Sequence, residues 1–178
     1  MDKGKKEQEL SLRDGVKIVF IAILISLFIT RFIVSSTTVD GHSMEDSLKN
    51  NDRLIVWKFS IDIKDLSRGD IVVFHAPDDE KKDYIKRVIA FPNEYVQIED
   101  GLVYINGERL EERYINTPFT YTSLEKEWFV KEGELFVMGD NRLEGASRDS
   151  RTFGAIKQDS LVGKAIFRFF PWTRMGGI

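Results

Sequence analysis

The longest run of apolar positions lies near the N-terminus, where residues 18–30 read IVFIAILISLFIT and carry no charge. As a helix this run would cover about 20 Å, less than the roughly 30 Å of a bilayer's hydrocarbon core. Extending it to Val34 lengthens the helix, provided that Lys17 and Arg31 reach toward the lipid headgroups. The pattern therefore predicts a single transmembrane anchor over residues 18–34.

The charges on the two sides of this segment predict its orientation. More basic residues precede it than directly follow it, and those that precede it are Lys3, Lys5, Lys6, Arg13 and Lys17. Because basic residues near a span stay on the cytoplasmic side, residues 1–17 should form a cytoplasmic tail. Residues 35–178 should then form a domain on the extracytoplasmic face of the cell membrane.

Two other interpretations of the apolar segment are open. A cleavable secretory signal also has a basic start and an apolar core of this length, and the small residues of VSSTT (34–38) resemble its cleavage site. A helix buried in a protein core is the second alternative, because the apolar run is short for a span.

Beyond residue 38 the apolar residues follow the pattern of short β-strands. Three segments are rich in valine, isoleucine and aromatic residues, as strands are: RLIVWKF (53–59), DIVVFHA (70–76) and YIKRVIAF (84–91). The charged stretch PDDEKKD (77–83) is predicted to be a solvated loop between the last two.

The second half of the chain continues this pattern. YVQIEDGLVYINGERL (95–110) is predicted to be a meander, since Asp100-Gly101 and Asn106-Gly107 both signal tight hairpins. Residues 127–142 should form two more strands, and residues 161–172 a final one. No amphipathic stretch long enough for a helix follows the anchor. We therefore predict a mainly β protein, in which one transmembrane helix precedes an antiparallel, sheet-rich domain of barrel or sandwich type.

Composition and charge narrow the chemistry of this domain. Charged residues make up 31% of the 178 positions and hydrophobic ones 42%, as in a folded protein. A net charge of −3 gives no basic surface of the kind that binds nucleic acid. The absence of cysteine excludes disulfides, thiolate metal sites and a cysteine nucleophile. With two histidines and no HExxH motif, we predict no metal site.

Ser43, in TVDGHSMEDSL (38–48), is either a nucleophile or an ordinary turn serine. A serine nucleophile needs a base, and histidine, lysine or a carboxylate can serve. His42 is a poor base for Ser43, because neighbouring side chains on an extended chain point to opposite faces. His75 could complete a Ser-His hydrolase, although nothing in the sequence around it marks it for that role.

Lys86 is the second candidate base. In YIKRVIAF it shares one face of the predicted strand with Val88, and burial there would lower the pKa of its ammonium group. A neutral amine beside Ser43 would act as general base in a Ser-Lys pair. The alternative is a lysine that extends into solvent from a strand edge, since lysines are rarely buried.

Taken in order, these segments resemble the bacterial type I signal peptidases. The resemblance covers almost everything from the anchor onward. It rests on four motifs in the family's order: GHSM (41–44) with Leu48 after it, RGDIVVF (68–74), YIKRVIAFPNE (84–94) and MGDNRLEGASRDSRTFG (138–154). It also implies a small β subdomain over residues 93–138, between the two motifs that carry the catalytic machinery.

The resemblance implies a membrane-bound serine endopeptidase that removes signal peptides from secretory precursor proteins after small-x-small sites. Ser43 would be the nucleophile and Lys86 the general base. Ser147 would hydrogen-bond the lysine amine, and Asp149 and Arg151 would support that corner as an ion pair. The implied partners are precursor proteins and the lipid bilayer, and no cofactor is implied.

The match departs from the family within the nucleophile motif. Asp46 and Ser47 stand where the family usually has proline and threonine, and a carboxylate near Lys86 would favour the charged ammonium. Gly41 stands where some members have a serine that donates to the oxyanion, so a backbone group or water must serve. The alternative hypothesis is therefore a weak or inactive relative that binds exported precursors.

Overall fold

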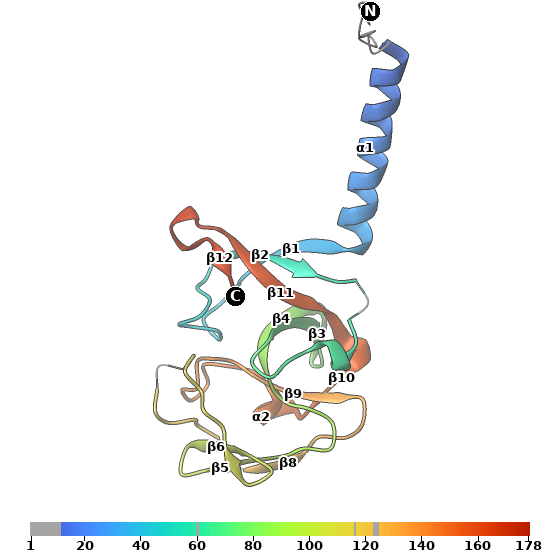
Figure 1. Ribbon diagram of the computed structural model, residues 1–178. Coiled ribbons are helices and arrows are strands. Elements are labelled where there is room, and N and C mark those ends of the chain that lie inside the picture. The colour runs from blue at the N-terminus through green and yellow to red at the C-terminus, as the bar shows by residue number, and fades with distance from the viewer. Residues whose placement is uncertain (1–11, 60, 116, 123–124) are drawn as a thin grey trace, which may run out of the picture.

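The first element of the structure is a long helix that projects away from the rest of the molecule (Figure 1). The computed structural model describes residues 12–59, 61–115, 117–122 and 125–178, and the helix, α1, spans Leu12–Phe32. None of its residues is buried, and it is long and apolar enough to cross a membrane. It begins before the predicted apolar run, whereas residues 1–11 of the predicted tail lie outside the described residues.

An antiparallel sheet forms the larger part of the domain. Its strands lie in the order β1-β2-β11-β3-β4-β9-β10, and β12 pairs with β11. Their bounds are β1 (Val34–Thr38), β2 (Arg53–Trp57), β3 (Ile71–Ala76), β4 (Asp79–Ala90), β9 (Glu134–Met138), β10 (Ile156–Lys157), β11 (Leu161–Phe170) and β12 (Gly176–Gly177). Because α1 leads almost directly into β1, this sheet lies at the end of the domain nearest the helix (Figure 1).

A second, smaller antiparallel sheet lies at the end of the domain far from α1 (Figure 1). Its strands lie in the order β7-β6-β5-β8. Their bounds are β5 (Tyr95–Glu99), β6 (Leu102–Ile105), β7 (Glu108–Arg109) and β8 (Glu127–Phe129). All four fall within residues 93–138, but β9, also in that range, pairs with β4 of the larger sheet. The segment as a separate subdomain therefore stays a prediction.

The two dipeptides predicted to be hairpin turns, Asp100-Gly101 and Asn106-Gly107, form the turns between β5, β6 and β7. Asp100 and Gly101 have φ angles of 48° and 77°, and Asn106 and Gly107 have 51° and 83°. Two consecutive residues with positive φ form the turn whose twist matches a hairpin, and asparagine, aspartate and glycine tolerate it best. The predicted mainly β, antiparallel fold after an N-terminal apolar helix is confirmed.

Apolar clusters join the sheets and support the loop between β1 and β2. Trp128 of β8 and Phe136 of β9 lie in one buried cluster, with ring centroids 5.1 Å apart, and so connect the small sheet to the large one. Met44 and Leu48, from the β1–β2 loop, are buried with apolar residues of the large sheet. The loop that carries Ser43 is therefore anchored by its own apolar side chains.

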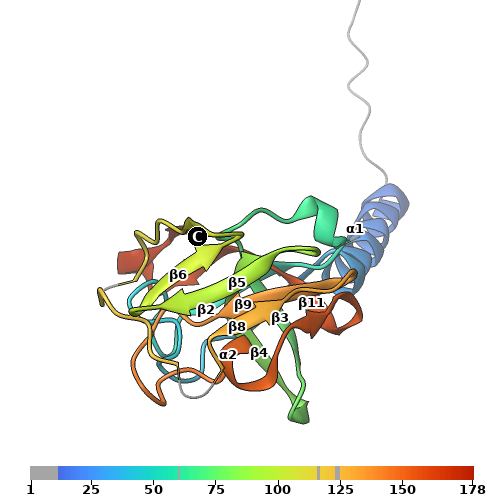
Figure 2. The ribbon, with the colours of Figure 1, turned by 90° about the horizontal axis from the view of Figure 1, so that it is seen from below.

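One local prediction was wrong. Most of the charged stretch 77–83, predicted to be a loop, belongs to β4, because β3 and β4 form a hairpin that extends beyond the body of the domain (Figure 2). Water on both faces of such a ribbon accepts charged residues. VSSTT (34–38), compared above with a cleavage site, is strand β1. Single helical turns also occur after the anchor: η1 (Ile63–Asp65), α2 (Ser150–Phe153), η2 (Gln158–Ser160) and η3 (Trp172–Arg174).

Candidate active site

The fold brings the Ser43 hydroxyl and the Lys86 amine together. Ser43 lies in the loop after β1, and Lys86 lies on β4, where it pairs with Val72 of β3. The Lys86 Nζ donates a hydrogen bond to Ser43 Oγ at 2.8 Å and another to the carbonyl oxygen of Ile85 at 2.9 Å. A base within hydrogen-bonding distance of a hydroxyl is the geometry that serine activation needs.

Burial changes the acid–base chemistry of Lys86. The residue is only 4% exposed, and among the described residues it forms no ion pair. Burial lowers the pKa of its amine to about 8, although the negative charges of Asp149 and Asp140 raise it in part. The positive charge of Arg151 acts in the opposite direction to these two carboxylates and lowers the pKa of the lysine. A substantial fraction of the amine is therefore neutral near physiological pH.

The loop around Ser43 is fixed by backbone contacts at several points. Gly41 has a φ of 98°, which favours glycine, and its N–H donates to Asn50 Oδ1 at 3.0 Å. From the other side, the Asn141 N–H donates to the Ser43 carbonyl oxygen at 3.0 Å, and Asn141 Nδ2 donates to the His42 carbonyl at 3.2 Å. The GDNR motif therefore holds the backbone of the loop that carries Ser43.

Asp149 organises the segment that follows GDNR. Its carboxylate accepts hydrogen bonds from Ser147 Oγ at 2.6 Å and from the Gly139 N–H at 2.9 Å, and it forms an ion pair with Arg151 at 2.7 Å. Despite complete burial, these contacts keep the pKa of Asp149 below its ordinary value. The predicted hydrogen bond from Ser147 to the Lys86 amine is not among the contacts of the described residues, and its role stays a prediction.

Gly139 allows Ser147 to lie close to the backbone of Ser43. A Cβ atom added to this glycine would lie 2.3 Å from Ser147 Oγ and 2.4 Å from the Ser43 carbonyl oxygen. Real Cβ atoms do not approach other atoms so closely, so any other residue would separate these two serines.

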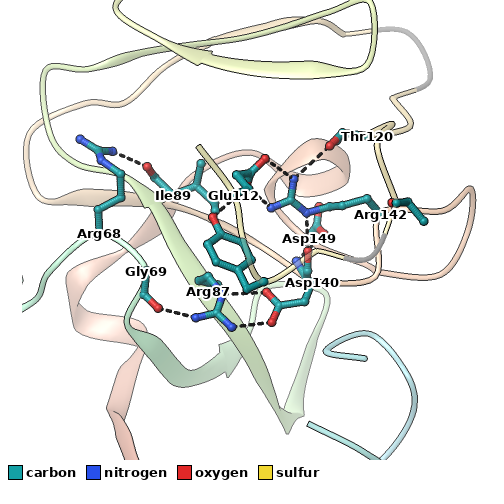
Figure 3. Close-up of polar contacts among 12 residues, drawn as sticks. Arg68, Gly69, Arg87, Ile89, Glu112, Thr120, Asp140, Arg142 and Asp149 are labelled. Carbon is teal, nitrogen blue, oxygen red and sulfur yellow. Dashed lines mark hydrogen bonds and ion pairs between the residues drawn. The ribbon is translucent and has the colours of Figure 1, made fainter. Parts of the chain in front are cut away.

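Two buried arginines, Arg87 and Arg142, form ion pairs next to the site (Figure 3). The sequence analysis assigned neither of them a role. Arg87 pairs with Asp140 through two hydrogen bonds of 2.8 and 2.5 Å and donates to the Gly69 carbonyl at 2.6 Å. Arg142 is fully buried and pairs with Glu112. Asp140 and Arg142 belong to the quoted GDNR motif, but a motif read as turn residues gives no sign that its charges are buried.

Among the described residues, neither histidine is recorded in contact with the Ser43 hydroxyl. Nδ1 of His75 lies 2.8 Å from an oxygen of Asp83, and Nδ1 of His42 lies 2.8 Å from one of Glu45; both histidines are exposed. Within the described ranges, no group of three or more histidine and acidic residues could hold a metal ion.

Ser43 and Lys86 line a cleft of about 190 Å³. Its walls come from the end of β1, including Thr37 and Thr38, and from residues 83–85 of β4. In the described structure β1 pairs only with β2, and the part of β4 before Arg87 pairs only with β3. Each wall therefore carries a strand with an unpaired backbone edge, which is a template for an added strand.

Comparisons with known proteins agree with this architecture. A sequence model of the family described as "Signal peptidase, peptidase S26" matches residues 12–172. The chain is 36% identical to a probable signal peptidase I-1 of Synechocystis sp., with 93% of this chain and 86% of that protein covered. It is 36% identical to signal peptidase I of Bacillus caldolyticus, with 87% and 90% covered.

A solved structure of a signal peptidase I from Enterococcus faecalis is also similar, at 35% identity. It covers 58% of this chain and 98% of its own, with a TM-score of 0.47. The family match extends from the apolar helix through the segments that carry Ser43 and Lys86 to the end of β11. The curated relatives are covered over 86% and 90% of their length. The chain belongs to the signal peptidase family, peptidase S26.

Proposed function

We propose that this protein is a membrane-bound serine endopeptidase that removes N-terminal signal peptides from exported precursor proteins, with Ser43 as nucleophile and Lys86 as general base. Family membership supports signal peptide removal. The observation that carries the mechanism is the 2.8 Å contact between Ser43 Oγ and a buried lysine whose pKa is lowered to about 8. It is the arrangement that Ser-Lys catalysis requires.

The reaction follows from these groups. The neutral Lys86 amine takes the hydroxyl proton while Ser43 Oγ attacks the scissile carbonyl carbon. The backbone N–H of Ser43 is the proposed donor to the oxyanion that forms. The lysine ammonium then gives its proton to the leaving amine, and an acyl-serine remains. In the second half, Lys86 takes a proton from water, the resulting hydroxide attacks the ester, and Ser43 regains its proton.

The cleft supports an extended substrate that adds a strand between the edges of β1 and β4. Along such a strand every second side chain points to the same wall. The walls near Ser43 carry apolar residues, including Met44 and Ile85, and enclose little volume. Small side chains at two alternate positions would fit there and larger ones would be excluded, which matches small-x-small sites.

The proposed orientation has the N-terminus in the cytoplasm and residues 35–178 outside. At 1.5 Å per residue, a helix of the length of α1 spans about 30 Å, the thickness of the hydrocarbon core. Because β1 begins at Val34, only two positions after the helix ends at Phe32, the cleft wall lies close to the bilayer surface. The exposed aromatic side chains of Trp57 and Trp172 suit such an interface.

The test uses the full chain, purified in detergent, with a secretory precursor and mass spectrometry of the products. We expect one cut after a small-x-small site, lost in both Ser43→Ala and Lys86→Ala and retained in His75→Ala. A precursor left intact by folded wild-type protein would favour the binding relative, and Asp46→Pro would then test whether that residue weakens the base. Cleavage that survives in both Ser43→Ala and Lys86→Ala would exclude the proposed mechanism.

A further inference from the structure

Another buried carboxylate, besides Asp140 and Asp149, lies behind the loop that carries Ser43 and belongs to no part of the proposed mechanism. Asp52, at the end of that loop, is completely buried. It forms ion pairs with Arg168 of β11 and with Arg174 of η3, and it accepts a hydrogen bond from the Lys49 N–H at 3.0 Å. Both arginines belong to the C-terminal hairpin, which consists of β11, η3 and β12. The end of the chain therefore contacts the loop that carries Ser43.

Arg168 also contacts the loop directly. Its Nη1 donates to the carbonyl oxygen of Ser47 at 2.9 Å and lies 3.3 Å from Asp52 Oδ2. Its Nε donates to the carbonyl oxygen of Arg174 at 2.5 Å. One rigid guanidinium therefore connects the loop, the buried carboxylate and the C-terminal turn.

Ser47 is held from two sides. Its carbonyl oxygen accepts from Arg168, and its hydroxyl accepts from Arg87 Nη2 at 3.0 Å. Arg87 follows Lys86 on β4, so the second contact ties the loop to the strand that carries the base. Ser47 follows Ser43 by four positions, and the N–H of the next residue, Leu48, donates to the Met44 carbonyl at 2.8 Å, which closes a compact turn.

We propose that Arg168 is a positioning residue for the nucleophile. With Asp52 it fixes the Ser47 backbone from the C-terminal hairpin, while Arg87 fixes the Ser47 hydroxyl from β4, and the two contacts together set the distance from Ser43 Oγ to the Lys86 amine. The inference rests on the proposed Ser-Lys mechanism. It gives the C-terminal hairpin a part in catalysis, although no residue of that hairpin lines the cleft.

The test compares Arg168→Gln and Arg168→Lys with Lys164→Gln. Lys164 lies on the same strand and also forms an ion pair, with Asp70 at 2.7 Å, so it is a matched control outside the loop. Each full-length variant is assayed in detergent well below its own Tm, and kcat, KM and the pH profile are measured. If a substitution only destabilises the fold, Tm should fall while kcat of the folded protein stays unchanged.

For Arg168→Gln we expect kcat to fall about tenfold or more, because small displacements of reacting groups cost this much. KM should change less than about twofold and the pH midpoint should stay in place, since Arg168 contacts neither cleft nor lysine in the described structure. Arg168→Lys should recover part of kcat through a single donor to Ser47, and Lys164→Gln should match the wild type. Folded Arg168→Gln with wild-type kcat would overturn the inference.

Two further measurements separate the outcomes. If Arg168→Gln does not fold, Arg174→Gln replaces it: the Arg174 side chain is 30% exposed and contacts Asp52, so kcat should fall about threefold, and an unchanged kcat would overturn the inference. Ser43→Ala is run beside both. If Ser43→Ala cuts as the wild type does, the proposed function fails and this inference with it. If Ser43→Ala is inactive and the arginine variants are fully active, only this inference fails.

Discussion

Lys86 and Arg87 lie next to each other on β4, but their buried cationic side chains have different surroundings. Both residues are buried, with 4% and 8% of their surfaces exposed. Lys86 faces the cleft, where it contacts a hydroxyl and a carbonyl oxygen. Arg87 lies on the other face, where it forms an ion pair with Asp140 (Figure 3). The centre of the Tyr114 ring lies 4.1 Å from its guanidinium carbon. Adjacent residues alternate between faces of a strand, so one strand serves both environments.

The difference shows why a buried lysine can act as a base, whereas a buried arginine stabilises the structure as part of an ion pair. A lysine without a close carboxylate relieves its burial by losing a proton, which makes it useful as a base. An arginine keeps its charge at all physiological pH values, so burial requires a partner, and the pair then fixes geometry. The five predictions below test this contrast, in order of their expected effect on the cleavage rate.

Replacing Lys86 by methionine should have the largest effect. The methionine keeps an unbranched apolar side chain in the same space but cannot accept the Ser43 proton, so kcat should fall about 10³-fold. Circular dichroism and Tm should remain close to those of the wild type, because an uncharged residue suits the buried site. A methionine variant that cuts within tenfold of the wild-type rate would show that Lys86 is not the base.

Replacing Gly139 by alanine should be next. The added methyl group would lie within 2.4 Å of both Ser147 Oγ and the Ser43 carbonyl oxygen, so the nucleophile must move. We expect kcat to fall about 10²-fold. Gly15→Ala is the control, since a Cβ there meets nothing within 4 Å. Equal activity of the two variants would mean that the loop adapts without moving Ser43 Oγ.

The cleavage rate should depend on pH through Lys86. Only the neutral amine accepts a proton, so with its pKa lowered to about 8, kcat/KM should fall about tenfold per pH unit below pH 8 and level off above it. The same lowered pKa makes burial of the ammonium costly below about pH 8, so the free energy of unfolding should rise from there toward pH 10.5. A rate profile that is flat between pH 6 and pH 9 would contradict a lysine base.

Replacing Asp140 by asparagine should shift the pH profile of kcat/KM to lower pH. The negative charge of Asp140 raises the pKa of Lys86, so its loss should shift the midpoint of kcat/KM to lower pH. Arg87 loses its buried countercharge at the same time, and the free energy of unfolding should drop by about 3 kcal/mol. Thermal unfolding and the pH profile together test both faces of β4. A midpoint that rises instead would mean that another charge controls Lys86.

A substitution in the smaller sheet should leave the chemistry unchanged. Ile98 of β5 is 2% exposed and lies in the cluster that joins the sheets, so Ile98→Ala should cost about 2–5 kcal/mol of stability. Assayed where it is folded, this variant should keep the wild-type kcat and pH midpoint. A shifted midpoint would show that the small sheet influences the charges around Lys86.

Much of the fold follows from local patterns in the sequence. The hairpins at Asp100-Gly101 and Asn106-Gly107 could be predicted because only a few residue types accept positive φ angles. The alternation of strands such as β5 could be predicted because apolar side chains on a pleated strand bury one face. Strand β1 was missed because VSSTT has few large apolar residues, and its pairing with β2 comes from the neighbouring strand.

The candidate site could be predicted only in part. The roles of Ser43, Lys86, Ser147, Asp149 and Arg151 follow from a family resemblance, since the residues alone favour a solvent-exposed Lys86. The roles of Arg87, Asp140 and Arg168 were not predicted. Each depends on a partner far away in the chain, and a charged residue in the sequence carries no sign of whether it will be buried or of which residue it will contact.

The sequence by itself determined the apolar helix, the hairpin turns and most of the strands, because the apolar patterns and turn residues that mark them are local. Only the tertiary structure decided that Lys86 contacts Ser43 and that Arg87 contacts Asp140. The pKa of a lysine depends on how much water and which charges surround it, and these are fixed when distant segments pack together. The same residue type on the same strand therefore becomes a base or a solvated charge according to contacts that no local pattern contains.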